Sequence, residues 1–264
     1  MRLSERTTQS TAGRQSLTIC ITVRDELANI EPIVRDLPIV TTEQEILFVE
    51  GHSRDGTAME IDRVALAYPL KNVRRIVQPG IGQGDAIREG FLAARGDCIV
   101  LYEGDGTSDP EDVRAFYACL ASGTLDFIEG NRFGFRRERG SMPWLNRIGN
   151  WVFARFFSRA VGLELGDVLA GIKGIRKSDF LNLHRGWGEM GIEDPFGDFE
   201  LLVGAMRCGL AIGQLPIRYR PRSYGRSKTR VLRHGLLLLQ IAWRSRSVVR
   251  VAKAEDERLN VTRV

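Results

Sequence analysis

Short apolar runs alternate with amphipathic stretches along the first half of the 264-residue chain. The apolar runs are rich in Val, Ile and Leu, which favour strands, whereas the stretches between them repeat apolar residues at helical spacing. The predicted strands are residues 17–23, 45–50, 73–78, 97–104 and 125–130. The predicted helices between them are residues 29–37, 54–68, 84–95 and 110–121. This alternation indicates βαβ units and therefore an α/β fold with a mainly parallel sheet flanked by helices.

The second half of the chain combines longer helical patterns with two further candidate strands. Its predicted helices are residues 144–162, 198–209 and 231–249. Its candidate strands are residues 171–178 and 211–222. We find no internal repeat and no low-complexity linker in the sequence, so we expect one domain between two extensions. The predicted parts are a disordered leader over residues 1–16, a domain over residues 17–228, and a basic C-terminal helix and tail over residues 229–264.

The composition is that of a globular protein, with 43% hydrophobic and 27% charged residues. The longest apolar stretch, residues 235–243, is far shorter than the roughly 20 residues that a bilayer span requires. The polar N-terminus lacks the apolar core of a signal peptide. The four cysteines have no CxxC spacing, so we expect neither a disulfide framework nor a zinc site. Free thiols indicate a reducing, cytoplasmic compartment.

Charge is distributed unevenly, although the formal net charge is only +5. Residues 201–254 contain twelve Lys and Arg and no Asp or Glu. Such a segment suits an anionic membrane surface or a phosphorylated ligand. Nucleic acid is a weaker fit, because the segment has no aromatic interleaving and no zinc-finger or RRM pattern. With its apolar run at residues 236–243, the segment predicts peripheral attachment to the inner face of a membrane.

Two carboxylates stand where the strand over residues 97–104 ends. Glu103 and Asp105 are two residues apart, which on a strand directs both side chains to the same side. Gly104 between them predicts room for another group to approach closely. A site of two carboxylates and little else offers hard oxygen ligands. Mg²⁺ or Mn²⁺ bound there would complete its coordination shell with water and phosphate oxygens. The alternative is a solvated loop rich in turn-forming residues, with Asp109 as the cap of the next helix.

Two more polar, glycine-containing loops follow strands of the same predicted sheet. Residues 50–57, EGHSRDGT, end the second strand and open a helix. Residues 80–90, GIGQGDAIREG, form a glycine-rich loop that leads into the next helix. In parallel sheets ligands bind beyond the carboxyl ends of the strands. Three such loops together suit a nucleotide that carries a diphosphate.

The order and spacing of these motifs resemble the family-2 glycosyltransferases of GT-A fold, especially the dolichol-phosphate mannose synthase and polyprenyl-phosphate glycosyltransferase branch. The resemblance extends from Leu17 to Lys228. It implies a GT-A (Rossmann-like) fold with a mixed, mainly parallel sheet. The segments that match the family's motifs are ITVRDELANI, VEGHSRDGT, GQGDAIREGFLAARGD, EGDGTSDPEDV, EGNRF, LNRIGNWVF, residues 167–171 and RSYGRSK.

The resemblance also assigns roles to side chains. Asp105, with Glu103, would hold the divalent ion at the sugar diphosphate, where the family has its Asp-x-Asp motif. The nucleotide-sugar site would comprise Asp25, Glu26, Glu50, Ser53, Asp85 and Glu103. The phosphate of the donor or of the acceptor would be bound by Arg132, Arg147, Arg226 and Lys228. Arg222 joins the last group, because it shares a short, acid-free loop with Arg226 and Lys228.

The chain departs from the family's pattern around the nucleotide and the metal. The metal motif begins with Glu103 where the family has Asp, and residues 50–52 read Glu-Gly-His where it has Asp-Asp-Gly. Residues 22–24 replace the family's Pro, Ala or Ser, and Tyr. Because charge is kept at most positions, these changes predict a subfamily with its own donor rather than an inactive enzyme.

The implied activity is inverting transfer of a hexose from a GDP-mannose or UDP-glucose type donor to a polyprenyl phosphate. A hydroxyl acceptor would need a carboxylate base, for which Asp194 and Asp198 are candidates. We count Asp198 with Asp105 and Arg132 as catalytic, and transfer to a saccharide hydroxyl in cell-surface polysaccharide synthesis stays open. A sugar-nucleotide nucleotidyltransferase fits less well, because RDELANIEP stands where its Gly-rich, basic loop would follow the first strand. A non-catalytic binding module would explain the basic end but not the carboxylates.

Overall fold

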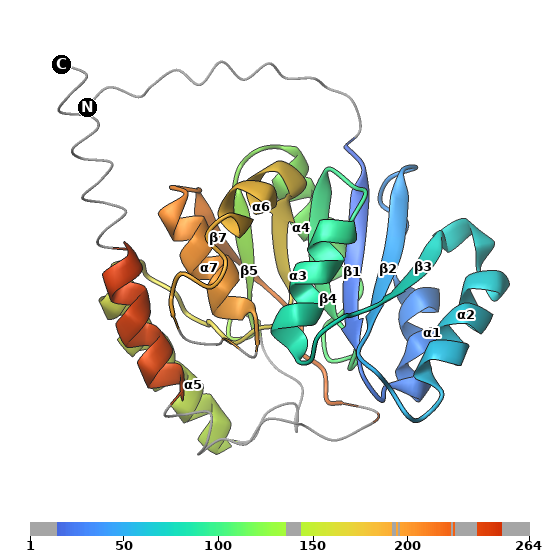
Figure 1. Ribbon diagram of the computed structural model, residues 1–264, viewed down its shortest axis with the longest axis horizontal. Coiled ribbons are helices and arrows are strands. Elements are labelled where there is room, and N and C mark those ends of the chain that lie inside the picture. The colour runs from blue at the N-terminus through green and yellow to red at the C-terminus, as the bar shows by residue number, and fades with distance from the viewer. Residues whose placement is uncertain are drawn as a thin grey trace.

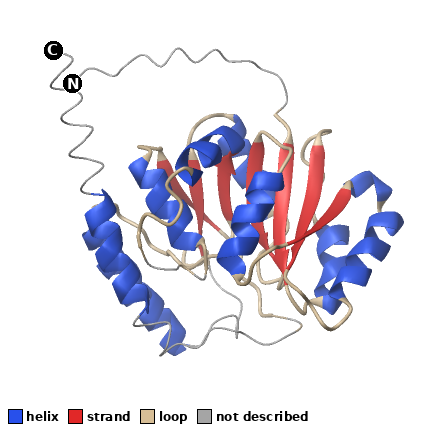
Figure 2. Ribbon diagram, viewed as in Figure 1, coloured by secondary structure: helices blue, strands red, loops and turns tan. Residues whose placement is uncertain are grey.

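The computed structural model describes residues 15–135, 144–191, 194, 196–222, 224 and 237–249. In this part of the chain a seven-stranded sheet forms the centre, and helices lie on both sides of it (Figures 1 and 2). The strand order is β3-β2-β1-β4-β6-β5-β7, and β6 runs antiparallel to both of its neighbours. The other neighbouring strands pair in parallel. The structure therefore confirms the predicted mixed, mainly parallel sheet.

The strands are β1 (Leu17–Val23), β2 (Gln44–Glu50), β3 (Val73–Val77), β4 (Cys98–Glu103), β5 (Phe127–Asn131), β6 (Lys173–Arg176) and β7 (Ile212–Pro216). The helices are α1 (Leu27–Asp36), α2 (Thr57–Ala67), α3 (Gln83–Ala93), α4 (Asp112–Ala121), α5 (Trp144–Val161), α6 (Lys177–His184) and α7 (Asp198–Arg207), with the 3-10 turn η1 (Pro69–Lys71). Residues 237–249 form a further helix, drawn in red in Figure 1. In the ranges given above, no helix combines the length and the apolar character that crossing a membrane requires.

The predicted strands are all present, and the largest differences lie in the second half of the chain. The strand predicted over residues 211–222 ends at Pro216, because the chain then leaves the sheet to pair with residues 107–109. The strand predicted over residues 171–178 ends at Arg176, and α6 follows at once. The sequence analysis missed α6, since its eight residues are too few to show a helical period against the adjoining strand.

Alternate residues of the central strands face two different helical layers. Ile19 and Ile21 of β1 pack in a buried cluster with residues of α1, α2 and α4. Cys20 packs in a second cluster with residues of α3, α5, α6 and α7. Because both faces of the sheet are buried, the strands read as continuous apolar runs rather than as an alternation of apolar and polar residues.

Candidate active site

A cleft of about 750 Å³ opens at the carboxyl edge of the sheet. Its walls are the segments that follow β1, β2, β3 and β4, together with Phe196 and Arg222. These four strands are parallel, so their carboxyl ends meet at one edge and bring the three predicted loops together. Of the predicted site residues, the cleft lining contains Glu26, Glu103, Asp105 and Arg222.

Glu103 and Asp105 lie in the cleft at the end of β4. Glu103 is the last residue of the strand, and Asp105 lies in the turn that follows. Thr107 fixes Asp105 by donating two hydrogen bonds to Oδ1, from its backbone N–H at 3.0 Å and from its hydroxyl at 2.8 Å. Burial raises the pKa of Glu103 to about 8, and the charge of Asp105 adds to the rise, while Arg132 opposes it. The two carboxylates thus repel each other, and a cation between them would relieve that repulsion.

Glycines at two positions let the chain close around this pair. A Cβ added at Gly171 would overlap the carboxyl group of Glu103, so a larger residue there would displace that carboxylate. A Cβ added at Gly104 would lie 2.4 Å from Val23 Cγ1 and 2.7 Å from the Thr22 carbonyl oxygen. The sequence predicts room for an incoming group at Gly104. The structure fills that room with the end of β1, because β1 and β4 are paired up to this point.

The chain after β7 crosses the loop that holds Asp105. Residues 218–220 pair with residues 107–109 through backbone hydrogen bonds and an antiparallel bridge. This pairing leads Arg222 to a position between two carboxylates of the cleft. Its Nη1 donates to Glu26 Oε1 at 3.2 Å, and its Nη2 donates to Asp105 Oδ2. The guanidinium that the sequence analysis assigned to phosphate is therefore paired with Glu26 and Asp105 in this structure.

Hydrogen bonds tie the loops after β1 and β2 together. The N–H of Asp25 donates to the Ser53 hydroxyl at 2.9 Å, and Asp25 Oδ1 accepts from the Arg54 N–H at 2.8 Å. Glu50 Oε1 accepts from the Ser53 N–H at 2.5 Å. Asp25 and His52 adopt left-handed backbone conformations, with φ of 52° and 60°, which are uncommon for residues other than glycine. The structure thus places Asp25, Glu50 and Ser53 in the framework of these loops, outside the cleft lining.

Asp85 holds the glycine-rich loop in shape. Its Oδ2 accepts from the Gly80 N–H at 2.8 Å, and its Oδ1 accepts from Nη2 of Arg88 at 2.8 Å. Gln78 braces the same loop by donating from Nε2 to the carbonyl oxygens of Gly80 at 3.0 Å and Gly82 at 3.2 Å. Gln78 and both glycines line the cleft, whereas Asp85 does not. The structure therefore gives Asp85 a role in positioning the loop that forms one wall.

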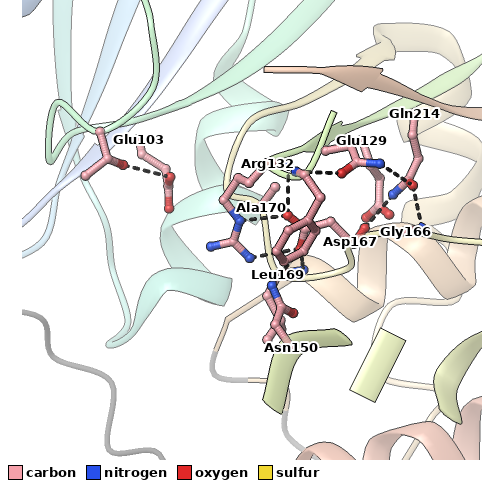
Figure 3. Close-up of polar contacts among 12 residues, drawn as sticks. Glu103, Glu129, Arg132, Asn150, Gly166, Asp167, Leu169, Ala170 and Gln214 are labelled. Carbon is pink, nitrogen blue, oxygen red and sulfur yellow. Dashed lines mark hydrogen bonds and ion pairs between the residues drawn. The ribbon is translucent and has the colours of Figure 1, made fainter. Parts of the chain in front are cut away.

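Arg132 forms a buried pair with Asp167 in the neighbourhood of Glu103 (Figure 3). Its Nε and Nη2 donate to the two carboxylate oxygens of Asp167 at 2.7 and 2.9 Å. Asn150 Nδ2 and the Leu169 N–H each add a hydrogen bond to Oδ1 at 3.1 Å. Burial alone would raise the pKa of Asp167, but the charge of Arg132, its hydrogen bonds and that of the Leu169 N–H keep the pKa below its usual value. The guanidinium is thus held by Asp167 and does not line the cleft.

A second buried ion cluster centres on Lys173 of β6. Its Nζ lies 3.1 Å from Glu129 Oε1 and 3.5 Å from Asp198 Oδ1, and it donates to the Ala170 carbonyl oxygen at 2.8 Å. Burial raises the pKa of Asp198 to about 7, and the charge of Lys173 opposes the rise. Asp198, a predicted catalytic residue, is therefore paired with Lys173 and lies outside the cleft lining.

Asp194, the other candidate base, caps the N-terminus of α7. Its Oδ2 accepts from the N–H groups of Phe199 at 2.8 Å and Glu200 at 3.2 Å, and its Oδ1 accepts from the Phe196 N–H at 3.0 Å. The N–H groups of Phe199 and Glu200 belong to the first turn of α7, which a helix leaves unpaired, so the carboxylate stabilises the helix end. Both candidates for a hydroxyl-activating base are thus held by other partners.

The remaining predicted phosphate-binding residues are not part of the cleft described here. Arg147 is exposed on α5 and does not line the cleft. Arg226 and Lys228 lie outside the described residues, as do residues 1–14 of the expected leader and residues 250–264 of the expected tail. The assignments made for them stay predictions.

The sequence analysis missed the cationic side of the cleft and the buried ion cluster. Arg24, His52 and Arg54 line the cleft, but the analysis treated residues 24 and 52 only as departures from a motif. A lysine inside an apolar strand was the available signal for the cluster, because an unpaired buried charge is costly. The sequence of β6 contains that signal at Lys173, but it does not show which carboxylates the fold brings to it.

Several known sequences are similar to this chain. The model of the family described as glycosyl transferase family 2 matches residues 18–183. The glycosyltransferase AglJ of Haloferax volcanii is 30% identical over 181 residues, which are 68% of this chain and 55% of AglJ. The chain thus spans little more than half of AglJ. The dolichol-phosphate mannosyltransferase of Saccharomyces cerevisiae is 28% identical over 214 residues, which are 77% of each protein.

A solved structure extends the comparison to the fold. Glucosyl-3-phosphoglycerate synthase of Mycobacterium tuberculosis, in complex with Mn²⁺, UDP-glucose and phosphoglyceric acid, matches with a TM-score of 0.65 at 18% identity. The match covers 89% of this chain and 80% of that one. At this identity the likeness concerns the fold, and it confirms the predicted GT-A architecture.

Proposed function

The chain belongs to glycosyl transferase family 2, and on this premise we propose that it transfers a hexose from a nucleotide sugar to a polyprenyl phosphate. The donor is a nucleoside diphosphate sugar of the GDP-mannose or UDP-glucose type, and the transfer inverts the anomeric carbon. The observation that carries the proposal is the acid pair Glu103 and Asp105 in a cleft whose walls also carry Arg24, Arg54 and Arg222. Negative charge builds on the leaving diphosphate during transfer, and cationic groups fixed near it lower the barrier.

Glu103 and Asp105 fit a divalent cation of the hard type. They offer carboxylate oxygens only, and within the described ranges no group of three or more His, Cys, Asp and Glu forms a complete protein metal site. Mg²⁺ and Mn²⁺ keep water and phosphate oxygens beside one or two carboxylates, so this pair suits a cation that binds together with a diphosphate. When bound, such a cation offsets the charge of the departing nucleoside diphosphate. The Mn²⁺ in the mycobacterial structure of the same fold supports this choice.

The state of the two candidate bases supports a phosphate acceptor. A hydroxyl acceptor needs a base within hydrogen-bond reach of the attacking oxygen, whereas a phosphate is already ionised. Asp194 caps α7 and Asp198 is paired with Lys173, so neither is available in the cleft. The yeast relative is named for the transfer of mannose to dolichol phosphate, which is a polyprenyl phosphate, and this supports the same acceptor class.

The test is a transfer assay with purified full-length protein and radiolabelled GDP-mannose or UDP-glucose. Undecaprenyl phosphate in detergent is the acceptor in one arm, and a free saccharide is the acceptor in the other. We expect label to enter the lipid extract of the first arm, and only when Mg²⁺ or Mn²⁺ is present. Label on the saccharide with none on the lipid would overturn the acceptor, and undiminished transfer in EDTA would overturn the metal.

A further inference from the structure

The face of α5 that points away from the core carries several large apolar side chains. The buried residues of this helix are Asn150, Phe153, Ala154, Phe157 and Val161. Its exposed large apolar residues are Ile148, Trp151, Val152 and Phe156. These two sets lie at helical spacing on opposite sides, and the Trp151 side chain is 59% exposed. A helix with apolar side chains on both sides packs one side on the core, and the exposed side indicates contact with a protein partner or a membrane.

The helix over residues 237–249 repeats this arrangement. Ile241 and Ala242 are buried in the same hydrophobic cluster that takes the inner side of α5. Leu239 and Trp243 are exposed, Trp243 to 64%. In Figure 1 this helix and α5 lie at the same edge of the molecule, opposite the edge formed by α1 and α2. The apolar run that the sequence analysis assigned to a membrane is thus divided between the core and the surface, and α5 supplies most of the exposed apolar residues.

Both helices are basic and contain no acidic residue. Their arginines are Arg147, Arg155, Arg159, Arg244 and Arg246. Within the part of the chain that the structure describes, none of the five forms a salt bridge. Arginines on other helices are paired, for example Arg63 of α2 with Glu31 and Glu60, and Arg114 of α4 with Glu111. The charge on this face is therefore balanced by no carboxylate of the described residues and favours an anionic partner.

We propose that the outer faces of α5 and of residues 237–249 form a docking surface for an anionic lipid bilayer. In this arrangement Trp151, Phe156 and Trp243 enter the headgroup region, and the arginines lie against lipid phosphates. Tryptophan and arginine around aliphatic side chains are the composition of helices that bind in the plane of a membrane interface. Only the purpose of this docking surface rests on the proposed function: it would bring the cleft to a lipid-linked acceptor.

Other occupants fit this surface less well. A second copy of the chain, related by a twofold axis, would bring the same arginines against each other. A nucleic acid would pair with the arginines but would leave Ile148, Val152 and Leu239 without apolar contacts. A bilayer surface satisfies both the charges and the apolar side chains.

The test is binding of the full-length protein to lipid vesicles, with neither donor nor acceptor present. Vesicles of phosphatidylcholine with phosphatidylglycerol are compared with vesicles of phosphatidylcholine alone, by co-sedimentation and by tryptophan emission. We expect binding to the anionic vesicles only, with a blue shift from Trp151 and Trp243. Arg155→Gln with Arg159→Gln should weaken binding roughly 30-fold, since each basic residue near an anionic surface contributes about a factor of five. Trp151→Ser with Trp243→Ser should weaken it about tenfold or more and reduce the blue shift.

Matched controls come from the other faces of the molecule. Leu66→Ser removes an exposed apolar residue from α2, and Arg114→Gln removes an exposed arginine from α4. Both should bind vesicles as the wild type does, and all variants should keep the wild-type circular dichroism and thermal midpoint, because the changed side chains are exposed.

Three results would overturn the docking surface. The first is equal binding of the wild type to neutral and anionic vesicles. The second is binding of both double variants as tight as that of the wild type. The third is that the protein binds no vesicles but forms a dimer or a nucleic-acid complex that the variants disrupt. The vesicle assay contains no sugar donor and is therefore independent of the transfer assay. If the protein binds vesicles as expected but transfers no sugar, the proposed function is contradicted and the docking surface is not.

Discussion

Two arginine–carboxylate pairs near Glu103 differ in how firmly their surroundings hold them. Asp167 is fully buried, and its carboxylate is held by Arg132, Asn150 and the Leu169 N–H. Asp105 and Arg222 are partly exposed, with side-chain exposures of 14% and 27%. A buried pair cannot change partners without leaving a charge in a medium of low dielectric constant, whereas an exposed pair can. The first pair is therefore a fixed part of the frame, and the second is able to exchange its partner for a ligand.

The largest effect is expected from Asp167→Asn. This change removes the charge opposite Arg132 and leaves a buried guanidinium with a neutral partner. We expect a loss of roughly 3–5 kcal/mol in the free energy of unfolding, measured by urea denaturation. Asp62→Asn is the matched control, because Asp62 pairs with Arg75 through two similar hydrogen bonds at the surface. If the Asp167 variant were as stable as the wild type, the pair of Arg132 and Asp167 would not be the fixed part of the frame that distinguishes it from the pair of Arg222 and Asp105.

Asp105→Asn should affect catalysis instead of stability. The residue is part of an open turn, and its proposed role is to hold the cation. We expect kcat/KM for sugar transfer to fall by about a hundredfold or more, with the free energy of unfolding changed by less than about 1 kcal/mol. Both quantities are measured on the same preparation. Transfer at the wild-type rate would contradict the assignment of Asp105.

Arg222→Gln tests whether the exposed pair exchanges its partner. Arg222 donates to Oδ2 of Asp105, and Thr107 already donates twice to Oδ1. A cation held by Asp105 would therefore compete with Arg222 for Oδ2. The variant should bind Mn²⁺ without nucleotide about tenfold more tightly, because one charge-assisted hydrogen bond no longer competes. Free Mn²⁺ is measured by electron paramagnetic resonance, which does not depend on activity.

Arg220→Gln is the control for this experiment. Arg220 lies two residues away and pairs with Asp109, outside the cleft lining. Its loss should leave the affinity for Mn²⁺ unchanged. Equal affinities in the wild type and both variants would show that Arg222 does not occupy the cation's place.

The sequence was enough to predict the strands, most helices and the acid pair, for physical reasons. Strands buried on both faces are continuous apolar runs, and parallel strands end at one edge, so the loops that follow them had to meet. Glu103 and Asp105 were found because they are close in the sequence. Glu26 and Arg222 lie 196 residues apart and meet only because the chain after β7 crosses the loop after β4.

Partners of buried charges could not be predicted in the same way. Arg132 and Lys173 were visible in the sequence, but a residue's partner depends on how elements pack. The carboxylates of Asp167 and Asp198 reach them from a loop and from the start of α7. Asp198 was assigned to catalysis from its residue type alone, and its pairing with Lys173 became visible only with the fold.

The last prediction concerns the pH dependence of stability and involves Asp198. Burial raises the pKa of Asp198 to about 7, against about 3.9 in an unfolded chain. The folded protein therefore binds this proton more tightly, so the proton stabilises the fold below about pH 4, and that stabilisation is lost as the pH rises towards 7. Asn resembles the protonated carboxyl group, so Asp198→Asn should equal the wild type near about pH 4 and exceed it by more than about 1 kcal/mol near about pH 8. Urea denaturation across this range measures the difference.

Asp62→Asn is the control, and its stability should change with pH in the opposite direction. The hydrogen bond from Arg75 lowers the pKa of Asp62, so the advantage of the wild type over that variant should shrink in acid. A difference for Asp198→Asn that stays constant with pH would mean that the carboxylate ionises in the folded protein as it does in water.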